Sequence, residues 1–379
     1  MPVHLNTAGA GLLEPAARAA MAEYLRLEAE IGPYETEERY VKVLTDGVYR
    51  GLGDLLGCGP DEIALFGSAT DAWCRVVRGL RLRPGGRIWT TPYEYAANLM
   101  VLRTLCEETG SELVVVPTRP DGDLDLDWMR AELDETVSLV SLVHMPSGAG
   151  VVLPVAEVGR ILAGSAAVYA VDACQTVGQL SIDVGAIGCD LLTGAGRKFL
   201  CGPRGTGFAF VARRVWDRVA PSFVDVHAFD PAPDGTARLA VDTAVRFETA
   251  ERSVAAVVGL AEAVEASRAR ELSGSLGAEP EVFAALDATL AAAPGVRPLT
   301  PGRERAGIVA FVHDRLPAAR VRAALAAQGC NVWEAHGAHT PLFFSPLRID
   351  HFIRVSVHWY NTPAEIDGLG RALSRLADH

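Results

Sequence analysis

The sequence predicts an α/β protein with a large domain built on a mainly parallel sheet and a smaller α/β domain. From residue 62 to residue 211, short and nearly continuous apolar runs alternate with segments of helical spacing. That alternation is typical of a parallel sheet covered by helices on both faces. A chain of 379 residues is long for one domain and short for three, and 49% hydrophobic residues can fill two cores. We expect the large domain over 14–270 and the small domain from 1–13 together with 271–379.

The elements of the large domain follow in chain order from apolar spacing and turn residues. Pro15 suits the first turn of a helix that begins at about Glu14, and residues 36–56 have the spacing of a core-facing helix. Residues 221–238 are rich in Pro, Asp and Gly without any period, and we expect a loop there before a long helix over 246–270. The predicted strands are 62–66, 87–91, 113–117, 137–143, 167–171, 190–192 and 208–211, and the predicted helices between them are 72 onward, 93–108, 126–133 and 155–163.

The C-terminal part of the chain again alternates helices and strands, after a glycine-containing hinge at 271–280. Residues 334–345 have no period that identifies a helix or a strand, and we expect a loop that faces the substrate. The predicted helices of this part are 281–292, 318–328 and 363–378, and the predicted strands are 308–313 and 352–358.

One lysine lies between two turns in the stretch from 190 to 211. The strand ending at residue 192 leads to Lys198, and Gly202, Gly205 and Gly207 then lead into the next strand. Glycine at this density lets a backbone approach a bound group closely. A lysine held in such a place is poorly solvated, which favours the neutral amine that attacks a carbonyl. Lys198 is therefore a candidate Schiff-base lysine, although a single loop lysine is more often an ordinary solvated side chain.

An acid upstream of the lysine favours the functional interpretation. Asp172 closes an apolar strand, and a carboxylate at this end of a buried strand lies where open α/β sheets bind ligands. Beside a pyridine nitrogen, such a carboxylate keeps the nitrogen protonated and makes the ring an electron sink. Asp172, Gln175 and the segment RKF-x-x-GPRGTG that begins at Arg197 together resemble the pyridoxal phosphate (PLP) enzymes of the class V aminotransferase family. That family contains cysteine desulfurases, isopenicillin N epimerase-like proteins and the C–S lyases of ergothioneine and lincosamide biosynthesis.

The resemblance covers nearly the whole chain and implies fold type I, PLP as the cofactor and a homodimer with active sites at the subunit interface. It implies that Lys198 carries PLP as a Schiff base, that Asp172 pairs with the pyridine nitrogen and that Gln175 bonds the ring oxygen. Lys198, Asp172 and Tyr95 are the expected catalytic residues.

Further cofactor contacts are implied residue by residue. Ala69 and Thr70 match the phosphate-binding turn between a strand and a helix N-terminus, although such a turn also suits an ordinary N-cap. Tyr95 stands where the family's E-H-H-A-N segment carries a histidine that stacks on the pyridine ring, with core packing as the alternative. Ser147 lies in a loop that the family places near the cofactor. Arg197 offers the phosphate a charge-assisted contact in place of a hydroxyl that the family carries.

The expected substrate is an amino acid or an amino-acid conjugate. Arg354 begins a tail that resembles the family's R-x-S-x-x-x-Y-N-T, whose arginine binds the α-carboxylate; a surface ion pair is the alternative. Asn6 lies in an N-terminal loop that the family places near the substrate, unless the loop is only a flexible terminus. His336 lies near a second histidine in the loop 334–340, and we expect it to face the substrate. Without a third ligand nearby in the sequence, no metal is expected there.

The resemblance leaves the reaction open, because transamination, epimerisation, decarboxylation and β-elimination all begin once Lys198 takes the Cα proton. A desulfurase also needs a mobile cysteine on the loop before the R-x-S tail, and residues 334–349 contain none. We therefore expect cleavage of the C–S bond of an S-substituted cysteine by β-elimination, in specialised metabolism. The alternatives are a decarboxylating or oxidative deaminase, an epimerase and an aminotransferase. A non-catalytic protein of this fold is disfavoured because Lys198 and Asp172 are both present.

Composition narrows the expected partners and location. The net charge is -12 and no basic run stands out, which argues against nucleic acids and anionic membranes as partners. No apolar segment approaches the roughly 20 residues needed to span a bilayer, and the first residues lack the regions of a signal peptide. The seven cysteines are scattered without a C-x-x-C pair, which suits free thiols in a reducing compartment. We expect a cytoplasmic enzyme.

Overall fold

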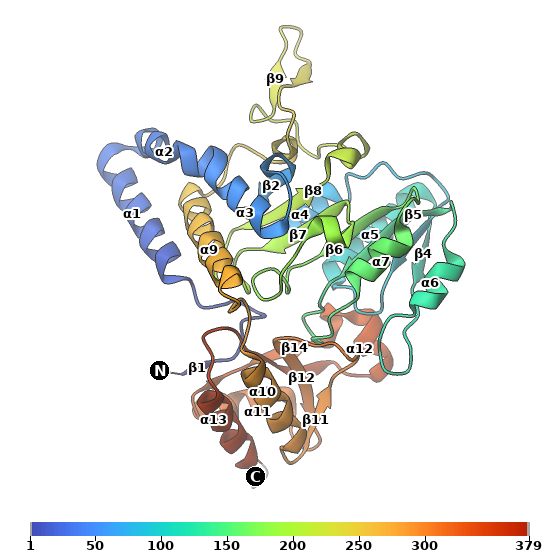
Figure 1. The fold of residues 1–379 in the computed structure, drawn as a ribbon, viewed down its shortest axis with the longest axis vertical. Helices are drawn as coiled ribbons and strands as arrows, with labels where there is room; N and C mark the ends of the chain where they lie inside the picture. Colours follow the sequence, from blue (N-terminus) through green and yellow to red (C-terminus); the bar gives the residue numbers. More distant parts are fainter. Residues whose placement is uncertain (1, 377–379) are drawn as a thin grey trace.

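The computed structural model describes residues 2–376, and a seven-stranded sheet, the large sheet, organises its N-terminal two thirds (Figure 1). Its strands are β2 (Ile63–Phe66), β3 (Arg87–Thr90), β4 (Glu112–Val115), β5 (Val137–Val143), β6 (Val168–Asp172), β7 (Leu191–Ala195) and β8 (Gly207–Val211). They lie in the order β2-β8-β7-β6-β5-β3-β4, in which β8 is antiparallel to both of its neighbours and all other pairs are parallel. The predicted α/β fold with a mainly parallel sheet is confirmed.

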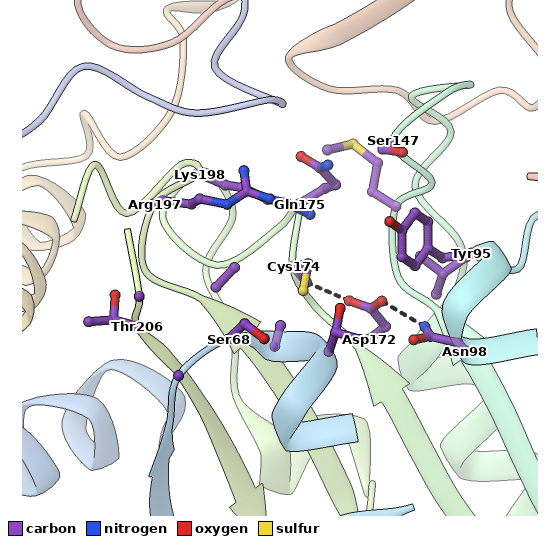
Figure 2. A pocket seen from close by; sticks show the side chains of 17 residues that line it. Ser68, Tyr95, Asn98, Ser147, Asp172, Cys174, Gln175, Arg197, Lys198 and Thr206 are labelled. Atoms are coloured by element: carbon purple, nitrogen blue, oxygen red, sulfur yellow. Dashed lines mark hydrogen bonds between the residues drawn. The ribbon is translucent and has the colours of Figure 1, made fainter. Parts of the chain in front are cut away.

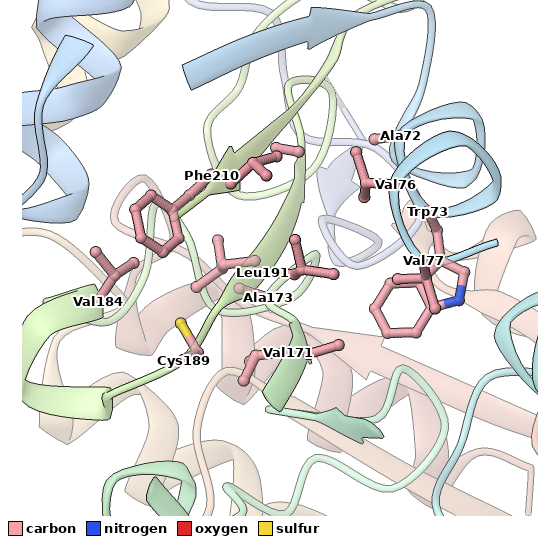
Figure 3. Close-up of a cluster of buried hydrophobic side chains, with 14 of the residues drawn as sticks. Ala72, Trp73, Val76, Val77, Val171, Ala173, Val184, Cys189, Leu191 and Phe210 are labelled. Carbon is pink, nitrogen blue, oxygen red and sulfur yellow. The ribbon is translucent and has the colours of Figure 1, made fainter. Parts of the chain in front are cut away.

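Helices pack on the large sheet through their apolar residues. Trp73 and Val76 of α4 belong to the same buried cluster as Leu191 of β7 and Phe210 of β8 (Figure 3). The long helix α9 packs along α1 and α3. The helices of this part are α1 (Pro15–Ile31), α2 (Pro33–Lys42), α3 (Val48–Leu56), α4 (Ala69–Val76), α5 (Ala96–Thr109), α6 (Leu126–Glu132), α7 (Val155–Leu162), α8 (Val184–Ile187) and α9 (Val254–Leu272).

A second, four-stranded antiparallel sheet, the small sheet, lies below the large one in Figure 1 and has the order β11-β12-β15-β14. Its strands are β11 (Val296–Leu299), β12 (Ile308–His313), β14 (Trp333–His336) and β15 (His351–Ser356). The helices α10 (Pro280–Ala292), α11 (Ala318–Ala327) and α13 (Pro363–Ser374) supply apolar residues to a second core beside it. The N-terminal strand β1 (Val3–His4) pairs with β13 (Cys330–Asn331), so the N-terminal segment joins the C-terminal part of the chain.

Three predicted segments differ from the structure. The helix expected over 36–56 is interrupted by a π-turn at Val43–Gly47. The loop expected at 221–238 contains a projecting hairpin of β9 (Phe229–Pro231) and β10 (Ala237–Leu239) (Figure 1). The helix expected from residue 246 begins at Val254, because the chain at Glu248 is held by its buried carboxylate, which accepts a hydrogen bond from Leu65 N at 2.7 Å.

The segment expected to be a loop at 334–345 is also structured. It contains the end of β14 and most of a short helix, α12 (Pro341–Leu347). Four residues of β14 pair with β15, from Trp333 opposite Arg354 to His336 opposite His351. A strand this short owes its structure to pairing with β15, so its own sequence pattern does not predict it.

The strand register gathers the predicted site at one edge of the large sheet. Val143 at the end of β5 lies opposite Asp172 at the end of β6, and Asp172 lies opposite Thr193 of β7. The segments that leave these strands therefore meet at the carboxyl edge, where open α/β sheets bind ligands. Within residues 2–376, no helix combines the length and the apolar character needed to cross a membrane.

Candidate active site

A pocket lies at this edge of the large sheet, between the turn before α4 and the segment that follows β7 (Figure 2). Every residue that the sequence predicts to bind the cofactor lines it, namely Ala69, Thr70, Tyr95, Ser147, Asp172, Gln175, Arg197 and Lys198. Among the other lining residues, four carry polar or thiol groups and are not among the predicted cofactor contacts: Ser68, Asn98, Cys174 and Thr206. The pocket thus joins groups that lie far apart in the sequence.

Lys198 lies in a turn whose backbone is firmly held. His358 of the C-terminal tail donates from Nε2 to the carbonyl oxygen of Phe199 at 2.7 Å. Gly178, with a φ of +92°, approaches the same residue so closely that a Cβ would lie 2.4 Å from the Phe199 carbonyl carbon. The chain has only one other lysine, Lys42, which is exposed at the end of α2. Lys198 is therefore the one lysine placed to react with a group in this pocket.

Asp172 is held by two donors, one to each carboxylate oxygen. Cys174 N donates to Oδ1 at 2.9 Å, and Asn98 Nδ2 donates to Oδ2 at 2.8 Å (Figure 2). Both bonds use the carboxylate purely as an acceptor, which suits its ionised form. The contacts fix Asp172 at the pocket wall with a defined orientation.

A second buried carboxylate, Glu94, orients the amide of Asn98. Asn98 Nδ2 also donates to Glu94 Oε1 at 3.0 Å, while hydroxyls of Thr90 and Ser141 donate to Oε2 at 3.0 and 2.8 Å. Burial raises the pKa of Glu94, and repulsion from Asp172 adds to the rise. The result is a continuous chain of contacts from Glu94 through Asn98 to Asp172. The Glu94–Asn98 spacing of four residues is visible in the sequence, but its link to Asp172 is not.

The turn before α4 presents a helix N-terminus to the pocket. Ser68 caps this helix by accepting a hydrogen bond from Asp71 N at 3.0 Å, so the ordinary N-cap is present as well. Ala69 and Thr70 begin the helix and line the pocket, where backbone N–H groups and the helix dipole favour an anion. Gly207 of β8 allows the close packing of the turn, because a Cβ there would lie 2.2 Å from the carbonyl carbon of Ser68.

Gln175 and Tyr95 add an amide and an aromatic ring to the groups of the pocket. Gln175 donates from Nε2 to the Ala8 carbonyl at 3.1 Å, while its buried Oε1 has no partner within residues 2–376. Tyr95 is partly buried at the pocket, and burial followed by repulsion from Asp172 raises its pKa. An amine, a carboxylate, an aromatic ring, a helix N-terminus and an unsatisfied buried amide oxygen thus share one pocket. That set fits PLP.

Arg354 forms no ion pair with any of residues 2–376, so its alternative role in a surface ion pair is not seen, and it lies buried beside the N-terminal loop. Its Nη2 donates to Asn6 Oδ1 at 3.2 Å, and its Nη1 donates to the Ser147 carbonyl at 3.3 Å. Its Nε is buried without a partner within residues 2–376. Burial and, secondarily, repulsion from Arg197 lower the pKa of Arg354 to about 10. A buried guanidinium with an unused donor is poised to take a carboxylate.

His336 and His339 lie differently with respect to the pocket. His336 is exposed at the end of β14, with its ring centroid 4.5 Å from that of His351 and 5.6 Å from that of His339. His339 lies closer to the cofactor residues, with its ring centroid 6.3 Å from that of Tyr95. From the sequence, His336 is the residue expected to face the substrate. In the structure, His339 lies between His336 and Tyr95. Within residues 2–376, no group of three or more His, Cys, Asp or Glu side chains is arranged to hold a metal ion.

Acidification is expected to destabilise the fold through two buried histidines. Burial lowers the pKa of His144 to about 4 and that of His358 to about 3, from an ordinary 6.5. The unfolded chain therefore binds protons below about pH 6.5 that the folded chain rejects, so the free energy of unfolding falls as pH drops from 6.5 toward 4. Urea unfolding at several pH values measures this. His358→Gln should show a shallower loss on acidification, and an equal slope in both proteins would contradict the assignment.

A family model described as Aminotransferase class-V matches residues 5–369. The chain belongs to the class V aminotransferase family. Members of this family are PLP-dependent, in agreement with the predicted cofactor and with the groups assembled in the pocket. The probable cysteine desulfurase of Methanothermobacter thermautotrophicus is 27% identical to this class V protein over 365 residues, covering 94% of this chain and 90% of the relative.

Solved structures of similar fold cover the whole chain or nearly so. The apo cysteine desulfurase from Thermococcus onnurineus has a TM-score of 0.87 at 22% identity, covering 100% of this class V chain and 95% of its own. A cystine C–S lyase in complex with its product, cysteine persulfide, has a TM-score of 0.83 at 20% identity, covering 98% and 97% of the two chains. A mutant of that lyase was solved with glycine covalently linked to PLP.

Proposed function

We propose that this class V protein is a C–S lyase that cleaves an S-substituted cysteine by β-elimination, in specialised metabolism. The products would be a thiol, pyruvate and ammonia, with one water consumed. The fold-related cystine C–S lyase supports this choice among the family's reactions, as its name states the same bond cleavage. Relatives named cysteine desulfurases support the same substrate class, because they act on a cysteine C–S bond.

The observation that carries the proposal is the lack of a reactive cysteine beside the pocket. Residues 334–349 contain no cysteine. Cys174 lines the pocket, but burial and then repulsion from Asp172 raise its pKa well above the usual range. Burial likewise raises the pKa of Cys201 to about 12, and Cys330 is buried in the core of the small sheet. A desulfurase needs a mobile thiolate nucleophile, whereas a lyase needs none.

The residues of the pocket have distinct parts in such a cleavage. When bound, PLP supplies a carbonyl for amines and a ring that accepts negative charge. Lys198 would remove the Cα proton, after which the Cβ–S bond would break and its electron pair would leave on sulfur. Asp172 keeps a negative charge at the pocket wall that would hold a proton on the ring nitrogen. Arg354 and Asn6 would hold the α-carboxylate, and Tyr95 and Gln175 would orient the ring.

The products distinguish this proposal from desulfuration. Wild-type protein incubated with S-alkyl-L-cysteines should release pyruvate, ammonia and the free thiol in equal amounts. A variant with Cys174, Cys201 and Cys330 all changed to serine should keep this activity if it remains folded. In a parallel incubation with L-cysteine itself, formation of alanine together with a protein-bound persulfide would instead identify a desulfurase. Release of CO2 and an aldehyde, or of racemised amino acid without thiol, would support the deaminase or epimerase alternatives.

Replacing Arg354 with alanine is expected to raise KM by about 10- to 100-fold and to change kcat less. The expected size is that of a charge-assisted hydrogen-bonded contact to the substrate carboxylate. Steady-state kinetics with an S-alkyl cysteine measures it. Arg320→Ala, which removes an exposed arginine from α11, serves as the matched control. A KM that stays unchanged in Arg354→Ala would make Arg354 a structural residue only.

We propose further that the protein is a homodimer. Exposed apolar side chains support this, namely Tyr34 and Val41 of α2 and Phe223, Val224 and Val226 before the β9–β10 hairpin. Tyr34, Val41 and His227 line one surface hollow, so α2 and the segment before the hairpin adjoin. Light scattering should give twice the chain mass of 40.3 kDa, and a monomer would count against a shared active site.

A further inference from the structure

The pocket region contains two arginines that no acidic side chain neutralises. Arg197 lines the pocket and Arg354 lies buried beside it, and neither forms an ion pair with any of residues 2–376. The acidic side chains nearby already accept hydrogen bonds from other groups. Asp172 accepts from Asn98 and Cys174, and Glu94 accepts from Asn98 and neighbouring hydroxyls. Burying or half-burying a cation without an acidic partner is costly, so such a site is organised for anions that arrive with a ligand.

The N-terminal loop holds both guanidinium groups on the same side of the pocket. Asn6 Oδ1 accepts from Arg354 Nη2 at 3.2 Å, and the carbonyl of Gly9 accepts from Arg197 Nη1. The two groups are close enough for the charge of Arg197 to contribute to lowering the pKa of Arg354. Figure 2 shows Arg197 extending toward Gln175, whose amide also contacts this loop through Ala8. Arg197 therefore lies with the residues that contact the N-terminal loop, where the substrate is expected to bind.

The phosphate end of the pocket has its own donors. The turn before α4 offers the backbone N–H groups of Ala69 and Thr70 at a helix N-terminus. The Arg197 guanidinium is instead hydrogen-bonded to the N-terminal loop at Gly9. A second anion besides the α-carboxylate and the phosphate is thus the ligand that would satisfy it.

We propose that the site takes a substrate with two carboxylates. Arg354 binds the α-carboxylate, and Arg197 binds a second carboxylate carried by the substituent on sulfur. This inference rests on the proposed C–S lyase function and names its substrate class, S-(carboxyalkyl)cysteines. A planar guanidinium fork matches a carboxylate in geometry and charge, which makes it selective for the acid over a neutral group of the same size.

The test compares S-(2-carboxyethyl)-L-cysteine with its neutral isostere, S-(2-carbamoylethyl)-L-cysteine. Wild-type holoenzyme should prefer the acid by about 10- to 100-fold in kcat/KM, the range of a charge-assisted contact. Arg197→Gln should bring this ratio close to one, and Arg197→Lys should keep part of it. Arg204→Gln removes an exposed arginine from the same segment and should leave the ratio unchanged. Circular dichroism of each variant checks that it is folded.

Two results would overturn the two-carboxylate site. One is an equal kcat/KM for both compounds in the wild type. The other is an Arg197→Gln variant that binds PLP more weakly, by titration of the apoprotein, while its preference for the acid is unchanged; Arg197 would then serve the phosphate. If neither compound releases a thiol, the C–S lyase proposal is wrong, but the two-carboxylate site can still be tested by binding. The Kd of each compound is then measured by titration of the holoenzyme absorption. Equal Kd values for the acid and its neutral isostere would refute the two-carboxylate site.

Discussion

Lys198→Ala is expected to lower turnover by more than about 10³-fold, because one side chain supplies both the covalent attachment point and the proton acceptor at Cα. The fold should remain intact, since the turn is held by the backbone of Phe199 and by Gly178 rather than by the lysine side chain. The measurement is kcat with an S-substituted cysteine, together with thermal unfolding.

Because the chain has only two lysines, covalent attachment of the cofactor to Lys198 can be tested directly. Borohydride reduction of the wild-type holoenzyme should fix the cofactor on the peptide that contains Lys198. Lys42→Ala removes an exposed lysine of α2 and should change neither labelling nor turnover. Label recovered on Lys42, or full turnover in Lys198→Ala, would refute the assignment.

Asp172→Asn is expected to lower kcat by about 10²- to 10³-fold with little change in KM, the range found for removal of one preorganised electrostatic contact. The substitution keeps the shape of the side chain but removes the charge that would hold a proton on the ring nitrogen. It also places an amide next to the donors Cys174 N and Asn98 Nδ2. A shift in the absorption of bound PLP should accompany the loss.

Another buried acid of the large sheet, far from the pocket, gives the matched control for Asp172→Asn. Asp190 is also buried, at the start of β7, where it accepts from Tyr169 N at 2.8 Å and from Arg214 Nε at 2.7 Å. It lies at the opposite edge of the sheet, so Asp190→Asn should lower stability and leave the PLP spectrum unchanged. Asn98→Ala should shift the spectrum in the direction of Asp172→Asn, by a smaller amount. A wild-type kcat in Asp172→Asn would remove Asp172 from the mechanism.

The large sheet and its cofactor groups could be predicted because their signals are local. The strands that end at Val143 and Asp172 are mostly apolar and buried throughout, so composition largely identifies them. Asp172 is the last residue of one such strand and Lys198 lies in the turn after another, and the carboxyl ends of neighbouring parallel strands meet at one edge. Their grouping therefore follows from topology.

Other parts of the site depend on contacts between distant segments. Strand β14 has four residues and forms by pairing with β15, so residues 334–345 gave no recognisable period. Choosing between His336 and His339 required the position of Tyr95, which comes from another part of the chain. The link between Glu94 and Asp172 passes through Asn98, and Asn98 and Asp172 are 74 positions apart. A single sequence carries no signal for such a pairing.

The contacts between the N-terminal loop and β15 also determine when the pocket can form during synthesis. Asn6 meets Arg354 across 348 positions, and it forms a bridge with Ser356. Contacts of such separation form late, because the loop between them must first be closed. On the ribosome, the large sheet can begin to assemble while the loop from Asn6 to Gly9 still lacks its partners. Assembly of the substrate side of the pocket is therefore expected to wait until the last strand, β15, has emerged.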